Sequence, residues 1–139
     1  SEESSTLTYK QREISKVERF AKSLARLDSV AAKVNMPAGQ RELIANAGEA
    51  CTQLLNKLFS KMPDTFTPPA ASQAVHFEKG QTVSPSEEFA ELYSKLDNEV
   101  TVRDVVRMGG NEQGKGARIF LKVKRSDGSL VTVPAAHFE

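Results

Sequence analysis

The stretch VERFAKSLARLDSVAAKV, residues 17–34, decides the fold of this chain. Its apolar residues recur at steps of three and four over an interval without proline or glycine, at Val17, Phe20, Leu24, Leu27, Ala31 and Val34. That spacing places them along one side of an α-helix and is typical of a seam that packs against another helix. The sequence therefore predicts one long packing helix, and a capping-box pattern at Thr8 and Gln11 places its start near Thr8.

A second helix is predicted from Ala38 to Met62. Asn35, Met36 and Pro37 interrupt the first pattern, because proline lacks a backbone N–H and restricts the residue before it. Apolar residues then resume at helical spacing, in a stripe broader than that of the first helix. Two amphipathic helices joined by a short break predict an antiparallel helical hairpin over residues 1–62.

The apolar stripe of the second helix is wider than one partner helix covers. We therefore expect a further partner surface on this helix, and hence a homo-oligomer. The expected oligomer interface consists of Leu43, Ala47, Leu55 and Phe59.

The chain changes character after the hairpin. Residues 63–83 hold three prolines and no apolar period, which predicts a linker. Ser84, Pro85 and Glu87 then match a helix start, with a cap, a first-turn proline and a capping-box glutamate. The sequence predicts a short third helix that ends near Asp97 and shares one apolar face, made of Phe89, Leu92, Tyr93 and Leu96.

Residues 99–108 fit two interpretations. The alternation of Val100 and Val102 indicates a strand, whereas Thr101 and Asp104 match a capping box of a short helix that would end at Gly109. The alternation slightly favours a strand over Glu99 to Val102, followed by helical or irregular residues.

A β-hairpin is predicted at the C-terminal end. Ile119, Leu121 and Val123 alternate with polar residues, and Val131 and Val133 supply the next strand. A three-residue loop over 126–128, with Gly128 in the left-handed conformation, pairs Val123 with Val131 and makes one face wholly apolar. We therefore expect this loop rather than a two-residue one.

This register gathers cations around an aromatic ring on the face predicted to lie away from the core. Phosphates bind cations and bases stack on rings, so such a face is a candidate for nucleic-acid binding. The candidate residues are Lys115, Arg118, Phe120, Lys122 and Lys124.

No catalytic set emerges from the sequence. Residues 109–115 imitate the start of a phosphate-binding loop, but Gly116 stands where a serine or threonine would bind magnesium, so nucleotide hydrolysis is not expected. The chain has one cysteine and two histidines, far apart, and we expect no catalytic residue, no metal and no cofactor. With no apolar run long enough to cross a bilayer and no signal-peptide pattern at residues 1–6, we expect a cytoplasmic protein without a membrane segment.

These patterns predict an α+β fold: an N-terminal antiparallel helical hairpin (1–62), a proline-containing linker (63–83), and a short third helix with a small antiparallel β module, of a size that suits an SH3-like barrel (84–139). The numbers of basic (19) and acidic (18) side chains nearly balance, so overall charge indicates no partner. We expect a non-enzymatic assembly or adaptor protein that self-associates through its hairpin and contacts a macromolecule, not identified by the sequence, through its β module. The alternative is a nucleic-acid-binding accessory protein that uses the basic face of the β-hairpin.

Overall fold

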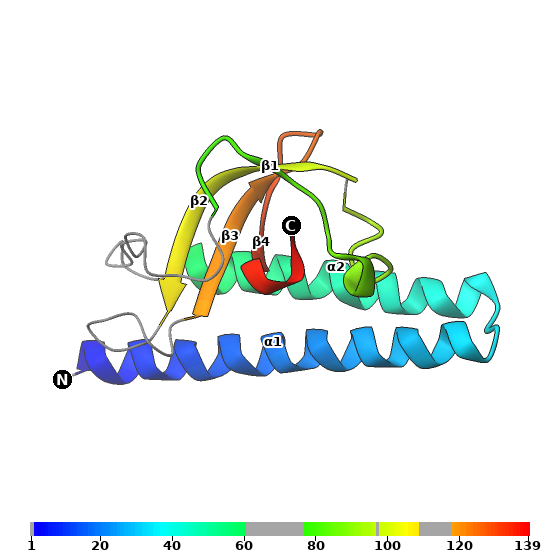
Figure 1. The fold of residues 1–139 in the computed structure, drawn as a ribbon. Coiled ribbons are helices and arrows are strands. Elements are labelled where there is room, and N and C mark those ends of the chain that lie inside the picture. The colour runs from blue at the N-terminus through cyan, green and yellow to red at the C-terminus, as the bar shows by residue number, and fades with distance from the viewer. Residues whose placement is uncertain (1, 61–76, 97, 109–117) are drawn as a thin grey trace.

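Two long antiparallel helices form one layer of the molecule, and a curled sheet lies on one side of them (Figure 1). The computed structural model describes residues 2–60, 77–96, 98–108 and 118–139. The helices are α1 (Glu2–Lys33) and α2 (Ala38–Ser60). The predicted hairpin is therefore confirmed, although α1 begins at Glu2 rather than near Thr8.

The turn between the helices follows from its residues. Asn35 has a φ of 53°, the left-handed conformation that asparagine tolerates and that often ends a helix. The Met36 N–H donates to the Ala31 carbonyl, 3.0 Å away, and Pro37 then precedes α2. An ion pair links the two helices near this turn, because Arg41 Nη2 of α2 donates to the Asp28 carboxylate of α1 at 2.8 Å.

The sheet has four antiparallel strands in the order β1-β2-β3-β4. They are β1 (Thr82–Val83), β2 (Val100–Met108), β3 (Arg118–Lys124) and β4 (Leu130–Pro134). The expectation of helical or irregular residues after Val102 is wrong, because β2 continues to Met108 through a bulge between Val102 and Asp104. Of the predicted linker, residues 63–76 lie outside the described residues, and its last two residues, Thr82 and Val83, form β1 and pair with β2.

The predicted β3–β4 turn is confirmed. Val123 pairs with Val131, Leu121 pairs with Val133, and Gly128 has a φ of 89°. The Gly128 N–H donates to the Arg125 carbonyl at 3.0 Å, which closes the three-residue loop.

The predicted third helix is wrong. Its residues form a short 3₁₀ helix, η1 (Glu87–Phe89), followed by turns. Ser84 exchanges two backbone hydrogen bonds with Glu139, each 2.8 Å long, and Pro85 bridges to Phe138. This pairing with the C-terminal end holds Ser84 and Pro85 in an extended conformation, so the helix-start signal is not used. The apolar residues of the predicted helix are nevertheless all buried: Phe89, Leu92, Tyr93 and Leu96.

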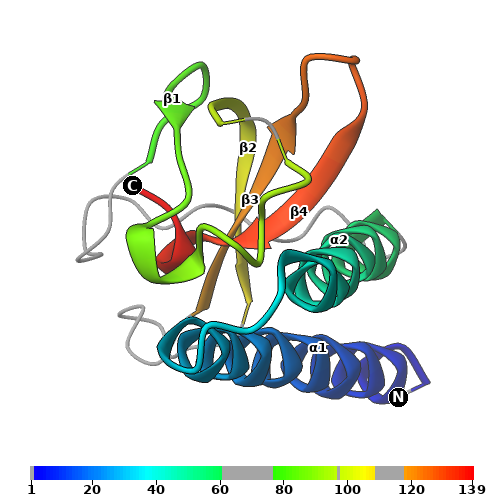
Figure 2. The same cartoon turned by 90° about the vertical axis from the view of Figure 1, so that its right-hand side faces the viewer.

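Both faces of the sheet are covered. The face that carries Leu121 and Val123 packs against the segment 89–96, the C-terminal Phe138, and Ala21, Leu24 and Cys51 of the hairpin. The opposite face carries Phe120, which packs with Ile14 of α1 and with Leu55 and Phe59 of α2. Figure 2 shows β4 beside α2, where Thr132 Oγ1 donates to Asn56 Oδ1 at 3.1 Å.

Ion pairs join the sheet to both helices. Arg118 of β3 donates to Glu18 of α1 at 2.8 Å, and Arg125, after β3, pairs with Glu49 of α2. The two pairs therefore link the two ends of β3 to different helices.

The contact between α2 and the segment after η1 is close enough to require a glycine. A Cβ atom at Gly48 would lie 1.9 Å from the backbone oxygen of Leu92. We expect Gly48→Ala to lower the free energy of unfolding by about 1–3 kcal/mol, the usual cost of overpacking, despite the better helix propensity of alanine. Urea denaturation measures the change.

Gly39→Ala is the matched control, because a Cβ there meets no atom within 4 Å. We expect this variant to be as stable as the wild type or slightly more stable. A Gly48→Ala protein as stable as the Gly39→Ala protein would contradict the described contact.

Candidate functional site

The structure divides the interface that the sequence predicts on α2. Leu55 and Phe59 are buried inside the chain, 1% and 4% exposed, because the Phe120 face of the sheet covers them. Leu43 is 66% exposed, and Ala47 is half-buried. The assignment of Leu55 and Phe59 to a surface between folded copies is therefore wrong, since a sheet rather than a second chain satisfies that part of the stripe.

The exposed apolar surface lies instead on both helices, on the side away from the sheet. We call it the apolar strip. On α1, Phe20, Leu27 and Val34 are spaced by seven, so they lie close to one line along the helix. Val30 lies between Leu27 and Val34 in the sequence. On α2 two leucines stand eleven residues, or three turns, apart. All six side chains are at least half exposed: Phe20, Leu27, Val30, Val34, Leu43 and Leu54.

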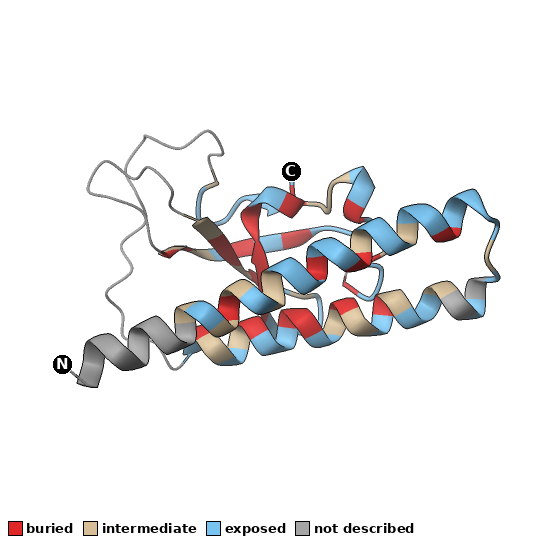
Figure 3. Cartoon of the chain, turned by 90° about the horizontal axis from the view of Figure 1, so that it is seen from below, coloured by how far each residue is buried: buried red, intermediate tan, exposed pale blue. Residues whose placement is uncertain are grey.

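Paired and buried residues of α1 show where its part of the strip lies. On α1, Glu18 and Asp28 reach toward the sheet and toward α2, and Leu24 and Ala31 are buried. Phe20 and Leu27 follow next around the helix, on the side opposite Glu18. Figure 3 views the hairpin from below and shows exposed residues alternating with buried ones along both helices.

Only half of the seam predicted from Val17 to Val34 therefore packs against the rest of the chain. Leu24 and Ala31 are buried and Val17 is half-buried, whereas Phe20, Leu27 and Val34 face solvent. The fully buried line of α1 runs through Ile14 and Ala21 instead. A small residue such as Ala21 carries a weak apolar signal, so the spacing of larger residues such as Phe20 and Leu27 dominates the pattern in the sequence.

The predicted basic face of β3 is not a stacking platform. Phe120 is fully buried, and its ring centroid lies 4.8 Å from that of Phe59. Arg118 is paired with Glu18, and Lys122 stands opposite Asp104 on β2. Lys124 is exposed, and Lys115 lies outside the described residues. The structure therefore does not bring these residues together as an aromatic surface flanked by cations.

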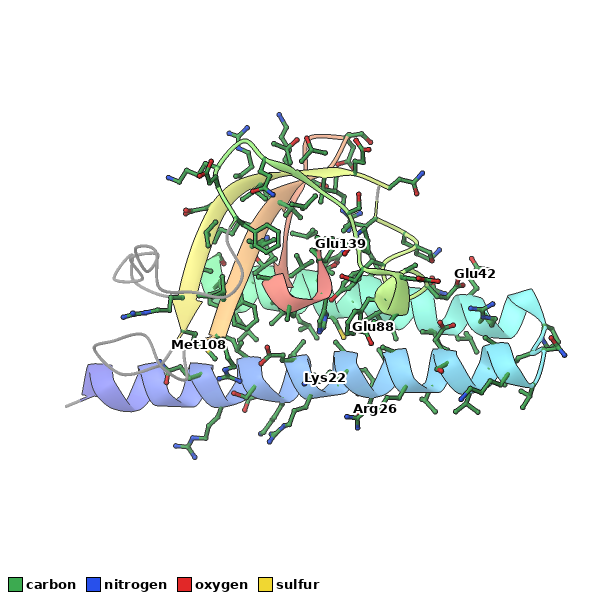
Figure 4. The ribbon with its side chains drawn as sticks, in the orientation of Figure 1. Lys22, Arg26, Glu42, Glu88, Met108 and Glu139 are labelled. Atoms are coloured by element: carbon green, nitrogen blue, oxygen red, sulfur yellow. The ribbon has the colours of Figure 1, made fainter. Side chains whose placement is uncertain are left out.

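An open groove of about 600 Å³ runs between α1 and η1. Lys22 and Arg26 line it from α1, and Glu87, Glu88 and Phe89 line it from η1. Lys22, Arg26 and Glu88 are labelled in Figure 4. The two cations on one side of the groove face the two carboxylates on the other side, but no ion pair shorter than 4.0 Å joins these described groups. The groove is thus a solvated seam between two elements.

A buried polar pair lies behind this groove. The Tyr93 hydroxyl is 2.6 Å from Nδ1 of His137, and the His137 ring stacks on Phe89 with centroids 3.8 Å apart. Burial lowers the pKa of His137 to about 4, and the positive charge of Lys22 adds to the effect. Burial also raises the pKa values of Tyr93 and Cys51, so neutral forms are favoured at all three sites. The pair joins η2 (Ala135–His137) to the segment after η1.

No protein-family model, curated protein or solved structure matches this chain. In the described part of the chain, no helix has both the length and the apolar character of a membrane span. Within the same residues, no three histidine, cysteine or acidic side chains converge as a metal site.

The His137–Tyr93 pair predicts a dependence of stability on pH. The pKa of His137 is about 4 in the folded state and about 6.5 when unfolded, so the unfolded chain binds more protons between these values. Stability is therefore unaffected above pH 6.5 and falls as the pH is lowered toward 4, by up to about 3 kcal/mol. Urea denaturation at pH 7 and pH 5 measures this slope.

His137→Phe is the matched variant, because a phenyl ring keeps the stacking on Phe89 and cannot titrate. We expect it to be less stable than the wild type at pH 7 but to lose less stability on acidification. Equal losses in the two proteins would show that His137 does not carry the pH dependence.

Proposed function

We propose that this protein is a non-enzymatic assembly protein that binds a second copy of itself through the apolar strip. The observation that carries the proposal is the size of the strip. A half-exposed large side chain presents about 100 Å², half of what an aromatic residue buries. Six such residues present on the order of 600 Å², the upper end for the largest apolar patch of a monomer.

The geometry of the hairpin favours a copy of the chain as the occupant. Two antiparallel helices with apolar outer rows are half of a four-helix bundle. A two-fold axis through the strip makes it pair with itself, as most homodimers do. A standard interface covers about 800 Å² on each partner, which the strip and its rim can supply.

The cations of α1 favour one arrangement of the helices between the two copies. The exposed side of α1 carries Arg19, Arg26 and other cations, so two α1 helices side by side would repel each other. On α2, Ala47 and Ala50 lie between Leu43 and Leu54 and leave room for large side chains. We expect α1 to pack against α2 of the other copy, with Phe20 and Leu27 over these alanines.

The same arrangement leaves both sheets on the outside of the pair, because the strip lies on the side away from them. The β module, of SH3-like size, is then free to contact another macromolecule. This second contact is the adaptor part of the proposal.

A charge placed in the strip tests self-association. We expect the wild type to show a mass above that of the monomer at micromolar concentration by light scattering. Leu27→Glu combined with Leu43→Glu should give monomers that keep the helical circular dichroism of the wild type, because both side chains are exposed in the folded chain.

Leu130→Glu is the matched control. Leu130 is also an exposed leucine, 46% exposed, but it starts β4 and lies far from the strip. We expect this variant to associate like the wild type. A wild type that stays monomeric at these concentrations, or equal effects of the substitutions in the strip and at Leu130, would rule out the proposed interface.

A further inference from the structure

A second surface of α1 has a different chemistry from the strip. Four cations are spaced by seven residues and form what we call the cationic row: Arg12, Arg19, Arg26 and Lys33. Seven residues advance a helix by about 10.5 Å and fall about 20° short of two full turns, so the row is about 31 Å long and drifts slowly around the helix. All four side chains are exposed. Figure 4 shows Arg26 on the side of α1 that faces away from the sheet.

The acidic side chains of this part of α1 are turned away from the row and paired. From Gln11 to Lys33 they are Glu13, Glu18 and Asp28, which bind Lys16, Arg118 and Arg41 at 3.1, 2.8 and 2.8 Å. No described acidic group lies within 4.0 Å of a charged nitrogen of the row. The row is therefore a line of positive charge with no directly bound carboxylate among the described groups, although Glu87 and Glu88 face Arg26 across the groove.

We propose that the cationic row binds the phosphate backbone of double-stranded nucleic acid without regard to sequence. The row spans close to one turn of a duplex, about 34–36 Å, so it meets both strands along one side. Three of its four members are arginines, whose guanidinium groups match phosphate oxygens in pairs. The proposal does not require self-association, because the guanidinium groups of the row lie on one flank of the outer side of α1 and Phe20 and Leu27 lie on the other.

The structure favours a duplex over a single strand. Proteins that bind single strands add stacking aromatic rings to their cations. Phe20 is the one exposed aromatic residue among the described side chains of α1, and it lies within the apolar strip. The row thus offers charges for a backbone and no ring for bases.

A duplex is also favoured over an anionic membrane. Arg19 and Phe20, and likewise Arg26 and Leu27, point about 100° apart because they are consecutive on a helix. Interfacial helices bury their apolar side in the bilayer, whereas this row stands on one flank only. A flat membrane surface that contacts the row would leave the apolar strip outside the bilayer. A duplex is a narrow rod and contacts the row alone.

The salt dependence of binding tests the proposal. With four phosphate contacts, log K should fall with log salt at a slope of about −3.6 for a duplex of mixed sequence. Replacing Arg12, Arg19 and Arg26 with glutamine should reduce the slope to about −1 and weaken binding at low salt at least tenfold. Glutamine keeps helix propensity, so thermal unfolding should be unchanged.

Lys122→Gln with Lys124→Gln is the control on the sheet, where the predicted basic face stands. We expect its slope to stay near that of the wild type. Unchanged binding in the triple variant, or no binding of the wild type to duplex at low salt, would overturn the proposal. Equal loss in the sheet variant would move the site to β3.

Two further binding measurements distinguish a duplex from other polyanions. Vesicles with about one-third anionic lipid should bind the wild type less than the duplex does, and stronger vesicle binding would assign the row to a membrane. Single-stranded DNA should bind more weakly than duplex, and the reverse result would overturn the choice of ligand. Light scattering of the triple glutamine variant should give the wild-type mass, so this proposal and self-association fail independently.

Discussion

The burial of Phe120 between the sheet and the hairpin is the contact on which the rest of the structure depends. Strand β3 passes between two apolar layers, with Leu121 in one and Phe120 in the other. The Phe120 ring contacts that of Phe59 on α2 and lies in one buried cluster with Leu55 of α2 and Ile14 of α1, so this cluster joins β3 to both helices. Without it, the sheet would have one apolar face and the second helix would keep an uncovered stripe.

This contact decides which part of the hairpin is free. Because the sheet covers the side that carries Leu55 and Phe59, Phe20 and Leu27 remain exposed on the other side with Leu43. The internal ion pairs likewise decide which charged groups remain on the outer side of α1. Glu18 and Asp28 are drawn toward the sheet and α2, which leaves the outer side of α1 with its cations. One docking event therefore produces two surfaces, one apolar and one cationic, that point in different directions.

Local patterns in the sequence predicted the elements that depend on local physics. Helical spacing and Pro37 give the hairpin, and Gly128 with the apolar pairing gives the β3–β4 turn, both of which the structure confirms. Contacts between distant segments overrode the local signals elsewhere. The bulge in β2 puts Val102 and Val105 on the same face, which imitates a helical period.

The burial of Phe120 was missed for a similar reason. Strict alternation puts one face of a strand in the core and the other away from it, so it places Phe120 on the face away from the core. The consecutive apolar residues Ile119, Phe120 and Leu121 are instead typical of a strand buried on both faces. That signal was present in the sequence, whereas nothing local indicates that Ser84 pairs with Glu139 rather than capping a helix.

Hydroxyl-radical footprinting of the native protein at low and high concentration tests this account most directly. Phe59 and Phe120 should be protected at both concentrations, because the chain itself covers them. Phe20 and Leu43 should be labelled in the dilute protein and protected in the concentrated one, whereas Leu130 should be labelled in both. Labelling of Phe120 as strong as that of Phe20 in the dilute protein would contradict the docking of the sheet on the hairpin and, with it, the surfaces inferred from that docking.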